Sequence, residues 1–473
     1  YMFFFDRLKK FIVNNWIFAT VIIFYLLTSA APLLWFRKIS DQFQFIGRGD
    51  YLPPINIQDI IYKEFFTINQ DMAGIQNAAN FGHLFPFNTI FLILYRLNID
   101  PIKSTLLLIS FIIFISQASF LYSMTYFLKK DHKPFSKESK LAMILSGILY
   151  GYSPFLLSLI APGHIILLFN YAVFPLIITF TDKLINSEKN NPNLFIVFFL
   201  LFLFSATSFA NFAIIYLNLF IIGLFGFLKI TIDKKPVFKT IYKLILFGLI
   251  LFLSNSWWLV SYLYEIFFNN VIFVVSSANV IKEYIANIPS PSYISLLLFG
   301  KTTFNYVVQE NERIFNILNI FSMFFIWIFF FRFIFSNTFK SKRIYLIFFI
   351  LMILVLFLTK GFSYPFPEIF NFLFYKVPGF VSFRNSHNKF FWFFWYCLLL
   401  LSTAGIIEHF INNGKKIVSF FLLSLLTCIS IFYIFTFIKH PQLGPFNIPN
   451  YYKQLNRYLG NKNNTKRLNK DCA

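Results

Sequence analysis

Long apolar segments, separated by short basic or longer mixed stretches, recur along the whole chain. Several contain about 18 or more residues, enough for an α-helix to cross a hydrocarbon core of roughly 30 Å. The segments are continuous, whereas a transmembrane β-barrel has strands of about ten alternating residues. The pattern therefore predicts an all-α polytopic membrane protein with about eleven transmembrane helices. The predicted spans are 11–31, 102–128, 141–160, 165–182, 194–209, 212–228, 241–263, 314–335, 344–359, 389–409 and 417–438.

The basic residues between the spans predict the topology. Lysine and arginine favour the cytoplasmic side of a membrane protein. One helix over 194–228 would put the lysine-rich segments 128–140 and 229–240 on opposite sides, so we predict a hairpin that turns near Asn211. The same reasoning makes 141–182 a hairpin. With a cytoplasmic N-terminus, the cytoplasmic segments are then 6–10, 128–140, 183–193, 229–240, 340–343 and 414–416.

The opposite side of the predicted membrane domain, residues 1–438, receives most of the polar chain. Its three long outer loops are 32–101, 264–313 and 360–388, and residues 439–473 follow as an extracytoplasmic tail or the truncated start of a soluble domain. Loops held by a rigid scaffold commonly carry function. We therefore expect the working site on the outer face of the plasma membrane.

Charge and composition exclude some classes of function. The 473 residues are 58% hydrophobic and 13% charged, with a net charge of +22. The basic residues are spread between the spans, which predicts contact with membrane lipids and no nucleic-acid partner. The ionisable residues Arg332, Glu408 and His409 lie near span ends, where a side chain can reach water. Transport driven by an ion gradient is disfavoured, because it needs ionisable groups deep in the membrane.

The first outer loop contains the segment FIGRGDYLPP at 45–54. Its two glycines and two prolines exclude a helix interior and predict a fixed turn that holds Asp50 above the membrane. A carboxylate there can act as general base on an acceptor hydroxyl, with Asp41 as the reserve candidate. The alternative is a solvated turn in which Asp50 caps an amphipathic interfacial helix at 57–68 or pairs with Arg48.

Two more short apolar segments lie in the outer loops. Residues 86–97 are too short to span comfortably and are interpreted as interfacial or re-entrant, and residues 367–375 form a phenylalanine-rich amphipathic element. No second carboxylate lies close enough to Asp50 for a dedicated divalent-metal site, so we predict no metal ligand.

The late outer loop ends in a cationic group, Arg384, His387 and Lys389, directly before a predicted span. A guanidinium offers a planar fork and an ammonium a point charge, and both suit a phosphate. The alternative is that these residues anchor a helix end at the membrane interface.

This organisation resembles the membrane region of GT-C superfamily glycosyltransferases, most closely the arabinofuranosyltransferase-type and YfhO-like members. Gly49-Asp50 matches the carboxylate of their first outer loop, and Pro378-Gly379-Phe380 with Phe383-Arg384 matches their late-loop motif. The tail segment 446–459 resembles the stretch that leads into their external soluble domain. The likeness covers most of the chain in organisation and rests on short motifs.

The resemblance implies a GT-C-like fold and an inverting sugar transfer from a polyprenyl-phosphate-linked donor to a glycan or lipid-linked acceptor. Asp50 would be the base, and Arg384, Lys389 and His387 would bind the donor phosphate. Arg48, Asp71 and His83 are assigned to acceptor or sugar binding. Two other functions stay open: a transporter or flippase of lipid-linked glycans, and a non-catalytic membrane subunit of envelope assembly.

Overall fold

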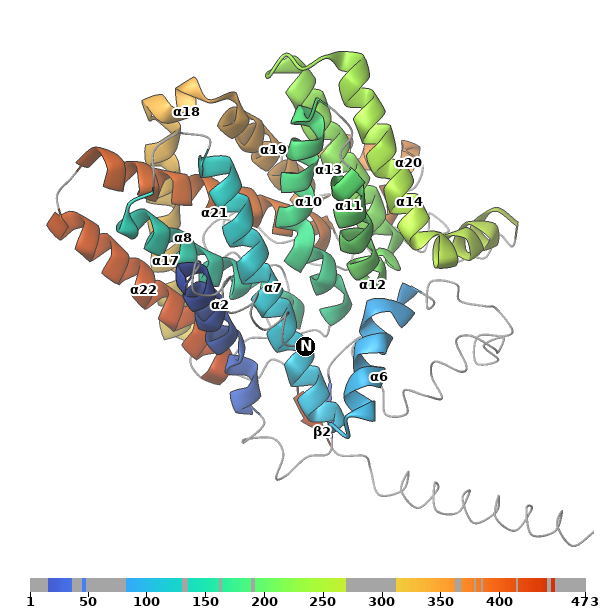
Figure 1. Cartoon of the computed structure of the whole chain (residues 1–473), viewed down its shortest axis with the longest axis horizontal. Coiled ribbons are helices and arrows are strands. Elements are labelled where there is room, and N and C mark those ends of the chain that lie inside the picture. The colour runs from blue at the N-terminus through green and yellow to red at the C-terminus, as the bar shows by residue number, and fades with distance from the viewer. Residues whose placement is uncertain are drawn as a thin grey trace, which may run out of the picture.

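The computed structural model describes residues 16–35, 45–47, 82–129, 135–160, 164–188, 192–268, 312–361, 367–377, 380–383, 386–413, 416–439 and 444–446. Within these ranges the chain is almost entirely helical (Figure 1). The elements are α2 (Trp16–Ser29), η1 (Ala31–Trp35), β1 (Phe45–Gly47), η3 (Leu84–Asn88), α6 (Thr89–Arg96), α7 (Pro101–Lys129), α8 (Lys137–Gly151), α9 (Pro154–Ile160), η4 (Ile165–Leu167), α10 (Leu168–Asn186), α11 (Pro192–Phe204), α12 (Ala206–Phe209), α13 (Phe212–Thr231), α14 (Val237–Phe268), α17 (Glu312–Ile334), α18 (Asn337–Ser341), α19 (Arg343–Thr359), α20 (Pro367–Lys376), η6 (Phe380–Phe383), α21 (Ser386–Asn413), α22 (Lys416–Lys439) and β2 (Gly444–Phe446).

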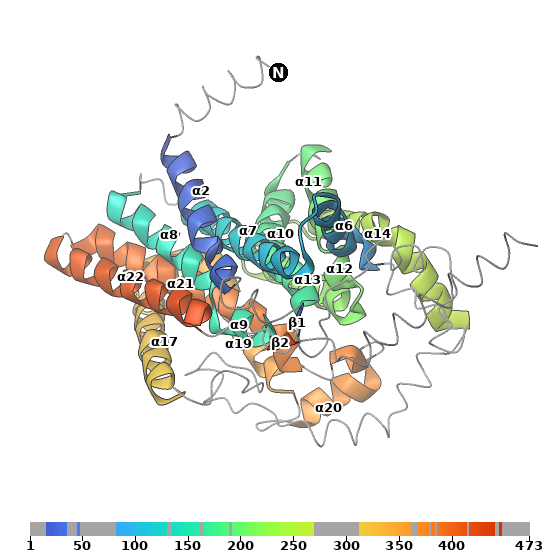
Figure 2. The same ribbon diagram turned by 90° about the horizontal axis from the view of Figure 1, so that it is seen from below.

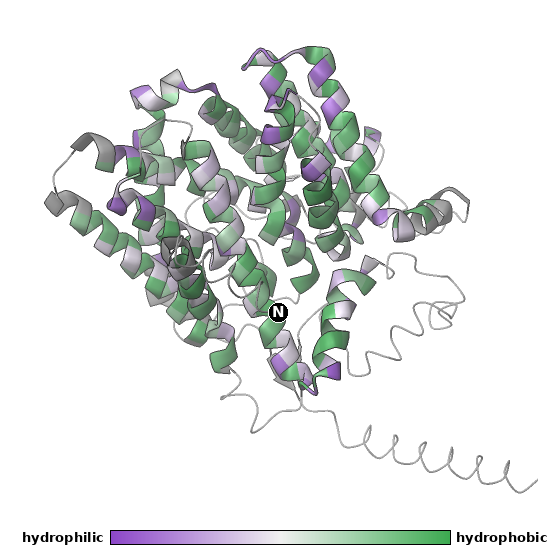
Figure 3. Ribbon diagram, viewed as in Figure 1, coloured by the Kyte–Doolittle hydropathy of each residue, from purple (hydrophilic) through white to green (hydrophobic). Residues whose placement is uncertain are grey.

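The predicted apolar spans overlap helices, although 141–160 is divided between α8 and α9 and residues 11–15 lie outside the described residues. Within the described residues, five helices are long and apolar enough to cross a membrane: Pro101–Leu128, Ile165–Asn186, Ala213–Thr231, Val237–Val260 and Lys389–Phe410. Six shorter apolar helices accompany them. Figure 3 shows hydrophobic residues along the helix bodies and hydrophilic ones gathered at several helix ends. The all-α architecture is that of a membrane protein, while the count of eleven spans and the GT-C-like fold stay predictions.

Helix α21 forms the centre of the bundle. Its apolar stretch is completely buried, and it packs against α19, α17 and α8. A stack of four rings crosses the core beside it: the ring centroids of Phe120 and Tyr150 are 4.7 Å apart, those of Tyr150 and Tyr171 4.5 Å, and those of Tyr171 and Trp392 6.4 Å. The two tyrosine hydroxyls donate to each other's backbone carbonyl, at 3.0 and 2.7 Å, so both are satisfied away from water.

One end of the bundle gathers three of the lysine-rich segments. The C-terminal ends of α7, α10 and α13 lie together there. The contacts of Tyr126 with Asp182 and of Asp182 with Lys229 join these three ends. The segments that follow these helices therefore lie at this end, which we call the basic end. A single long helix over this region is interrupted: α11 ends at Phe204, the short helix α12 follows, and α13 begins at Phe212. This interruption agrees with the turn predicted near Asn211.

We call the opposite end of the bundle the loop end. Helix α2 runs toward it parallel to α8, because the Tyr25 hydroxyl bonds Ile144 while the Thr28 carbonyl accepts from Tyr152. The chain then forms η1, which packs against α7 and α22. Strand β1 pairs in antiparallel fashion with β2, which follows α22 (Figure 2). The strand that follows the first helices of the chain is thus adjacent to the strand that follows the last helix, α22.

Two short helices of the predicted outer loops are amphipathic. In α20, Phe370 and Phe374 are buried whereas Phe372 is exposed, which confirms the amphipathic element predicted at 367–375. In α6, Phe91 is buried whereas Ile93 is exposed. The helix predicted at 57–68 lies outside the described residues.

Candidate functional site

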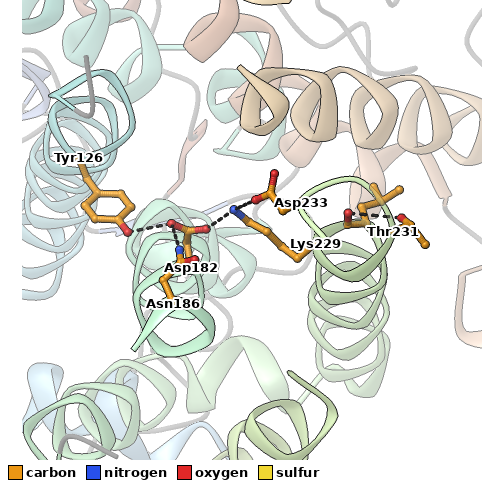
Figure 4. Close-up of polar contacts among 7 residues, drawn as sticks. Tyr126, Asp182, Asn186, Lys229, Thr231 and Asp233 are labelled. Atoms are coloured by element: carbon orange, nitrogen blue, oxygen red, sulfur yellow. Dashed lines mark hydrogen bonds and ion pairs between the residues drawn. The ribbon is translucent and has the colours of Figure 1, made fainter. Parts of the chain in front are cut away.

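A buried ionic cluster at the basic end brings one lysine between two carboxylates (Figure 4). We define it as Tyr126 of α7, Asp182 and Asn186 of α10, Lys229 of α13 and Asp233, which follows α13. The Lys229 ammonium lies between the two carboxylates, 2.7 Å from Asp182 Oδ1 and 2.6 Å from Asp233 Oδ2. The cluster joins three helices that are far apart in sequence.

Asp182 is fully buried and has three partners. Its Oδ2 accepts hydrogen bonds from the Tyr126 hydroxyl at 2.8 Å and from Asn186 Nδ2 at 2.9 Å, while Lys229 pairs with Oδ1. Removing a carboxylate from water costs several kcal/mol, and only close charge pairing with further hydrogen bonds offsets that cost. The arrangement around Asp182 supplies both.

Local helix geometry explains the pairing. Asp182 and Asn186 are four residues apart on α10, and Lys229 and Asp233 are four residues apart at the end of α13, so each pair shares one helix face. Lys229 also lies in the last turn of α13, where the helix dipole favours a cation. These positions place the carboxylate of Asp182 at the end of α10 next to the ammonium of Lys229 at the end of α13.

Lys243 of α14 adds a second buried cation at the same end. Its ammonium donates to the carbonyl of Leu184 at 2.7 Å and to the Ser187 hydroxyl at 2.6 Å, and also to the Ser187 carbonyl. Leu184 lies in the last turn of α10 and Ser187 directly follows the helix, where backbone carbonyls lack the usual partners within the helix. Lys243 therefore ties the start of α14 to the end of α10.

The sequence analysis missed this cluster. It placed Lys229 in a loop and noted only Arg332, Glu408 and His409 as ionisable residues near the spans. The available signal was Asp182 itself, one acidic residue at the end of a long apolar segment, which by default has a buried partner. The partner comes from another helix and could not be identified from one sequence.

Most of the predicted site residues lie outside the described residues. These are Asp41, Arg48, Asp50, Asp71 and Arg384. His387 lies in the first turn of α21, and its side chain is not among those described.

Lys389 is described, and it is 8% exposed near the start of α21. Three residues later, the Trp392 ring lies 5.7 Å from that of Phe174, and further along α21 the Tyr396 hydroxyl is 2.6 Å from Ser123. Thr179, one turn after Phe174 on α10, also bonds Ser123. Helix α21 thus runs parallel to α10, and Lys389 lies toward the loop end.

His83 lies where residues 82–88 dock on the break between α11 and α13. The Thr207 hydroxyl accepts from the Phe87 amide at 3.2 Å and donates to the Phe85 carbonyl at 3.1 Å. His83 Nδ1 is buried without a hydrogen-bond partner among the described residues. Burial lowers the pKa of His83 to about 4, and a backbone hydrogen bond with Thr207 opposes that effect in part. The imidazole is therefore neutral at pH 7.

The elements directly before Arg48 and Arg384 both lie at the loop end. Strand β1, which ends at Gly47, contacts α7 and pairs with β2. η6 ends at Phe383, whose ring centroid is 5.7 Å from that of Tyr216 in the second turn of α13. Among the described residues no group of three or more histidine, cysteine, aspartate or glutamate residues is placed to hold a metal ion.

Comparison of the chain with protein-family models, with curated proteins and with solved structures found no match in any of the three. The functional assignment therefore rests on the residues and their arrangement.

Proposed function

We propose that the protein is an integral membrane glycosyltransferase that uses a polyprenyl-phosphate-linked sugar as donor and a glycan or lipid-linked acceptor. One observation carries the proposal. The chain segments that lead into Asp50 and Arg384 end at the same end of the bundle as Lys389. Asp50 follows Gly47 by three residues, a reach of at most about 11 Å.

The proposed reaction is a single displacement. Asp50 takes the proton from the acceptor hydroxyl, and the oxygen attacks the anomeric carbon of the donor. The bond between that carbon and the phosphate oxygen breaks, the lipid phosphate leaves, and the anomeric configuration inverts. Arg384, Lys389 and His387 stabilise the negative charge that grows on the phosphate. Arg48, Asp71 and the neutral His83 would contact the acceptor or the sugar.

The burial of Lys389 supports its role. An ammonium that is only 8% exposed interacts with a phosphate more strongly than one in bulk water, since the local dielectric constant is lower. Its place in the first turn of α21 adds the positive end of the helix dipole, which favours an anion.

The test is transfer in vitro from a labelled polyprenyl-phosphate sugar by the full chain in lipid nanodiscs. We expect Asp50→Asn to lower the transfer rate about 10²–10⁴-fold, the usual contribution of a general base. Lys389→Met should lower it about tenfold or more, as expected for loss of one charge-stabilising group. The matched control is Lys103→Met, which removes a half-exposed lysine of α7 that pairs with Asp100.

The other two functions are outcomes of the same test. A flippase would keep its translocation of labelled lipid in the Asp50→Asn variant. A non-catalytic subunit would give no transfer with any donor. Full transfer activity of Asp50→Asn together with loss in Asp41→Asn would move the base to Asp41.

A further inference from the structure

A second surface at the basic end combines exposed lysines with exposed aromatic rings. We define the lysine–aromatic surface as Lys234, Lys235, Phe238, Lys239 and Tyr242, at the turn between α13 and α14 and in the first turns of α14. The Phe238 side chain is 90% exposed and that of Tyr242 is 50% exposed. A phenylalanine ring exposed to this extent beside cations is typical of a membrane or partner contact.

The lysines of this segment divide into two kinds. Residues 229–243 contain five lysines and one aspartate. Lys229 forms ion pairs with Asp182 and Asp233 in the ionic cluster. Lys243 donates a hydrogen bond to the end of α10. The side chains of the other three lysines form no ion pair or hydrogen bond with the described part of the chain. Three positive charges therefore remain without an acidic residue of the same segment to balance them.

The apolar side chains continue from this surface along α14. Every fourth residue from Ile241 onward is an exposed apolar one, so that a single helix face stays uncovered along most of the span. These residues are Ile241, Ile245, Leu249, Leu253 and Trp257. A row of cations at the head of a continuous apolar face matches one phospholipid molecule, with its phosphate near the lysines and its acyl chains along the helix.

We propose that the lysine–aromatic surface binds the headgroup of an anionic phospholipid in the leaflet at the basic end. The net positive charge selects an anionic over a zwitterionic headgroup, and Phe238 and Tyr242 lie at the depth of the glycerol region, where aromatic rings are favoured. An acidic protein or a nucleic acid would use the cations and leave the apolar face of α14 without a partner.

The experiment measures lipid selectivity. The full chain is equilibrated in nanodiscs of phosphatidylcholine with a minor fraction of phosphatidylglycerol, and the lipids retained by the protein are counted by native mass spectrometry. Each lysine near an anionic surface contributes an attraction that corresponds to about a fivefold change in binding. In the combined variant Lys234→Gln, Lys235→Gln and Lys239→Gln, we expect the ratio of retained phosphatidylglycerol to phosphatidylcholine to fall by about tenfold or more.

Two variants control this result. Lys137→Gln with Lys140→Gln removes two exposed lysines at the start of α8, also at the basic end, where Glu138 lies between them in sequence, and should lose much less of the preference. Phe238→Ser should weaken retention of both lipids and leave their ratio unchanged, since the ring does not read headgroup charge. An unchanged ratio in the triple variant, an equal loss in the α8 variant, or displacement of the lipid by inorganic phosphate alone would overturn the proposal.

Discussion

Lys229 of α13 and Asp182 of α10 form an ion pair in which Nζ and Oδ1 are 2.7 Å apart, and their side chains are only 2% and 0% exposed. Both side chains are buried away from bulk water. Each is compensated by the other and by the shell of Tyr126, Asn186 and Asp233. The pair therefore determines how the ends of α10 and α13 are joined, and it makes the consequences of single and double substitutions very different.

The first prediction is a double-mutant cycle on this pair. Lys229→Met should destabilise the protein by about 3–5 kcal/mol, because it leaves the buried carboxylate of Asp182 without its cation. Asp182→Asn should cost less, because the Lys229 ammonium keeps Asp233 as a partner. The double variant should cost less than the sum of the two, since no buried carboxylate remains at position 182. Unfolding in mixed micelles, followed by circular dichroism, measures all four proteins.

The control for this cycle is the exposed pair of Asp100 and Lys103, with 3.4 Å between the charged atoms. Its single substitutions should change stability by less than about 1 kcal/mol, as is usual for exposed pairs. Additive effects at Asp182 and Lys229 would contradict the proposed coupling.

A second prediction concerns Lys243, which binds acceptors at the end of α10. Lys243→Met should destabilise the protein by about 1–3 kcal/mol, because it removes the hydrogen bonds that a charged donor makes to Leu184 and Ser187. Lys239→Met lies one turn earlier on α14, on the exposed side, and should change stability little. Equal melting temperatures of the two variants in the same nanodiscs would show that the Lys243 contacts do not stabilise the fold.

The sequence predicted the helices well because hydrophobic length determines them. It also predicted the hairpin between α11 and α13, since the lysines of 128–140 and 229–240 must share one side. It could not predict the partner of Asp182 or the mutual bonding of Tyr150 and Tyr171. Those contacts join helices distant in the chain, and apolar segments of similar composition allow many alternative neighbours.

Only part of the candidate site could be predicted from the sequence. Lys389 stands out as a cation at a span boundary, and the structure shows it buried there, while its role as a phosphate ligand stays a prediction. His83 was assigned to acceptor binding from its place in a loop, but its low pKa depends on docking against Thr207, which no local pattern encodes. The relation of Asp50 to Arg384 stays a prediction, because both lie outside the described residues.

A third prediction concerns the close approach of α21 to α17. A side chain at Gly405 would overlap the backbone carbonyl of Phe329 and come within 3.1 Å of Phe333 Cβ. Small residues allow helices to pack this closely in membranes. Gly405→Ala should therefore lower stability by about 1–3 kcal/mol through overpacking. Gly248→Ala in α14 meets no atom within 4 Å and should be neutral or stabilising by up to about 1 kcal/mol. Thermal unfolding of the two variants in one lipid would decide, and a stable Gly405→Ala protein would argue against this helix contact.

The last prediction is a pH dependence from His83. Its pKa is lowered from the ordinary 6.5 to about 4, so between these values the unfolded chain binds a proton that the folded protein does not. Stability is thus fully retained above pH 6.5 and is lost as the pH falls toward 4. At pH 4.5 the loss from this one group is about 2–3 kcal/mol. The His83→Gln variant lacks the group, so its melting temperature should fall less than that of the wild type between pH 7.5 and pH 4.5. Parallel curves for the two proteins would mean that the imidazole takes up its proton as readily in the folded state as in water.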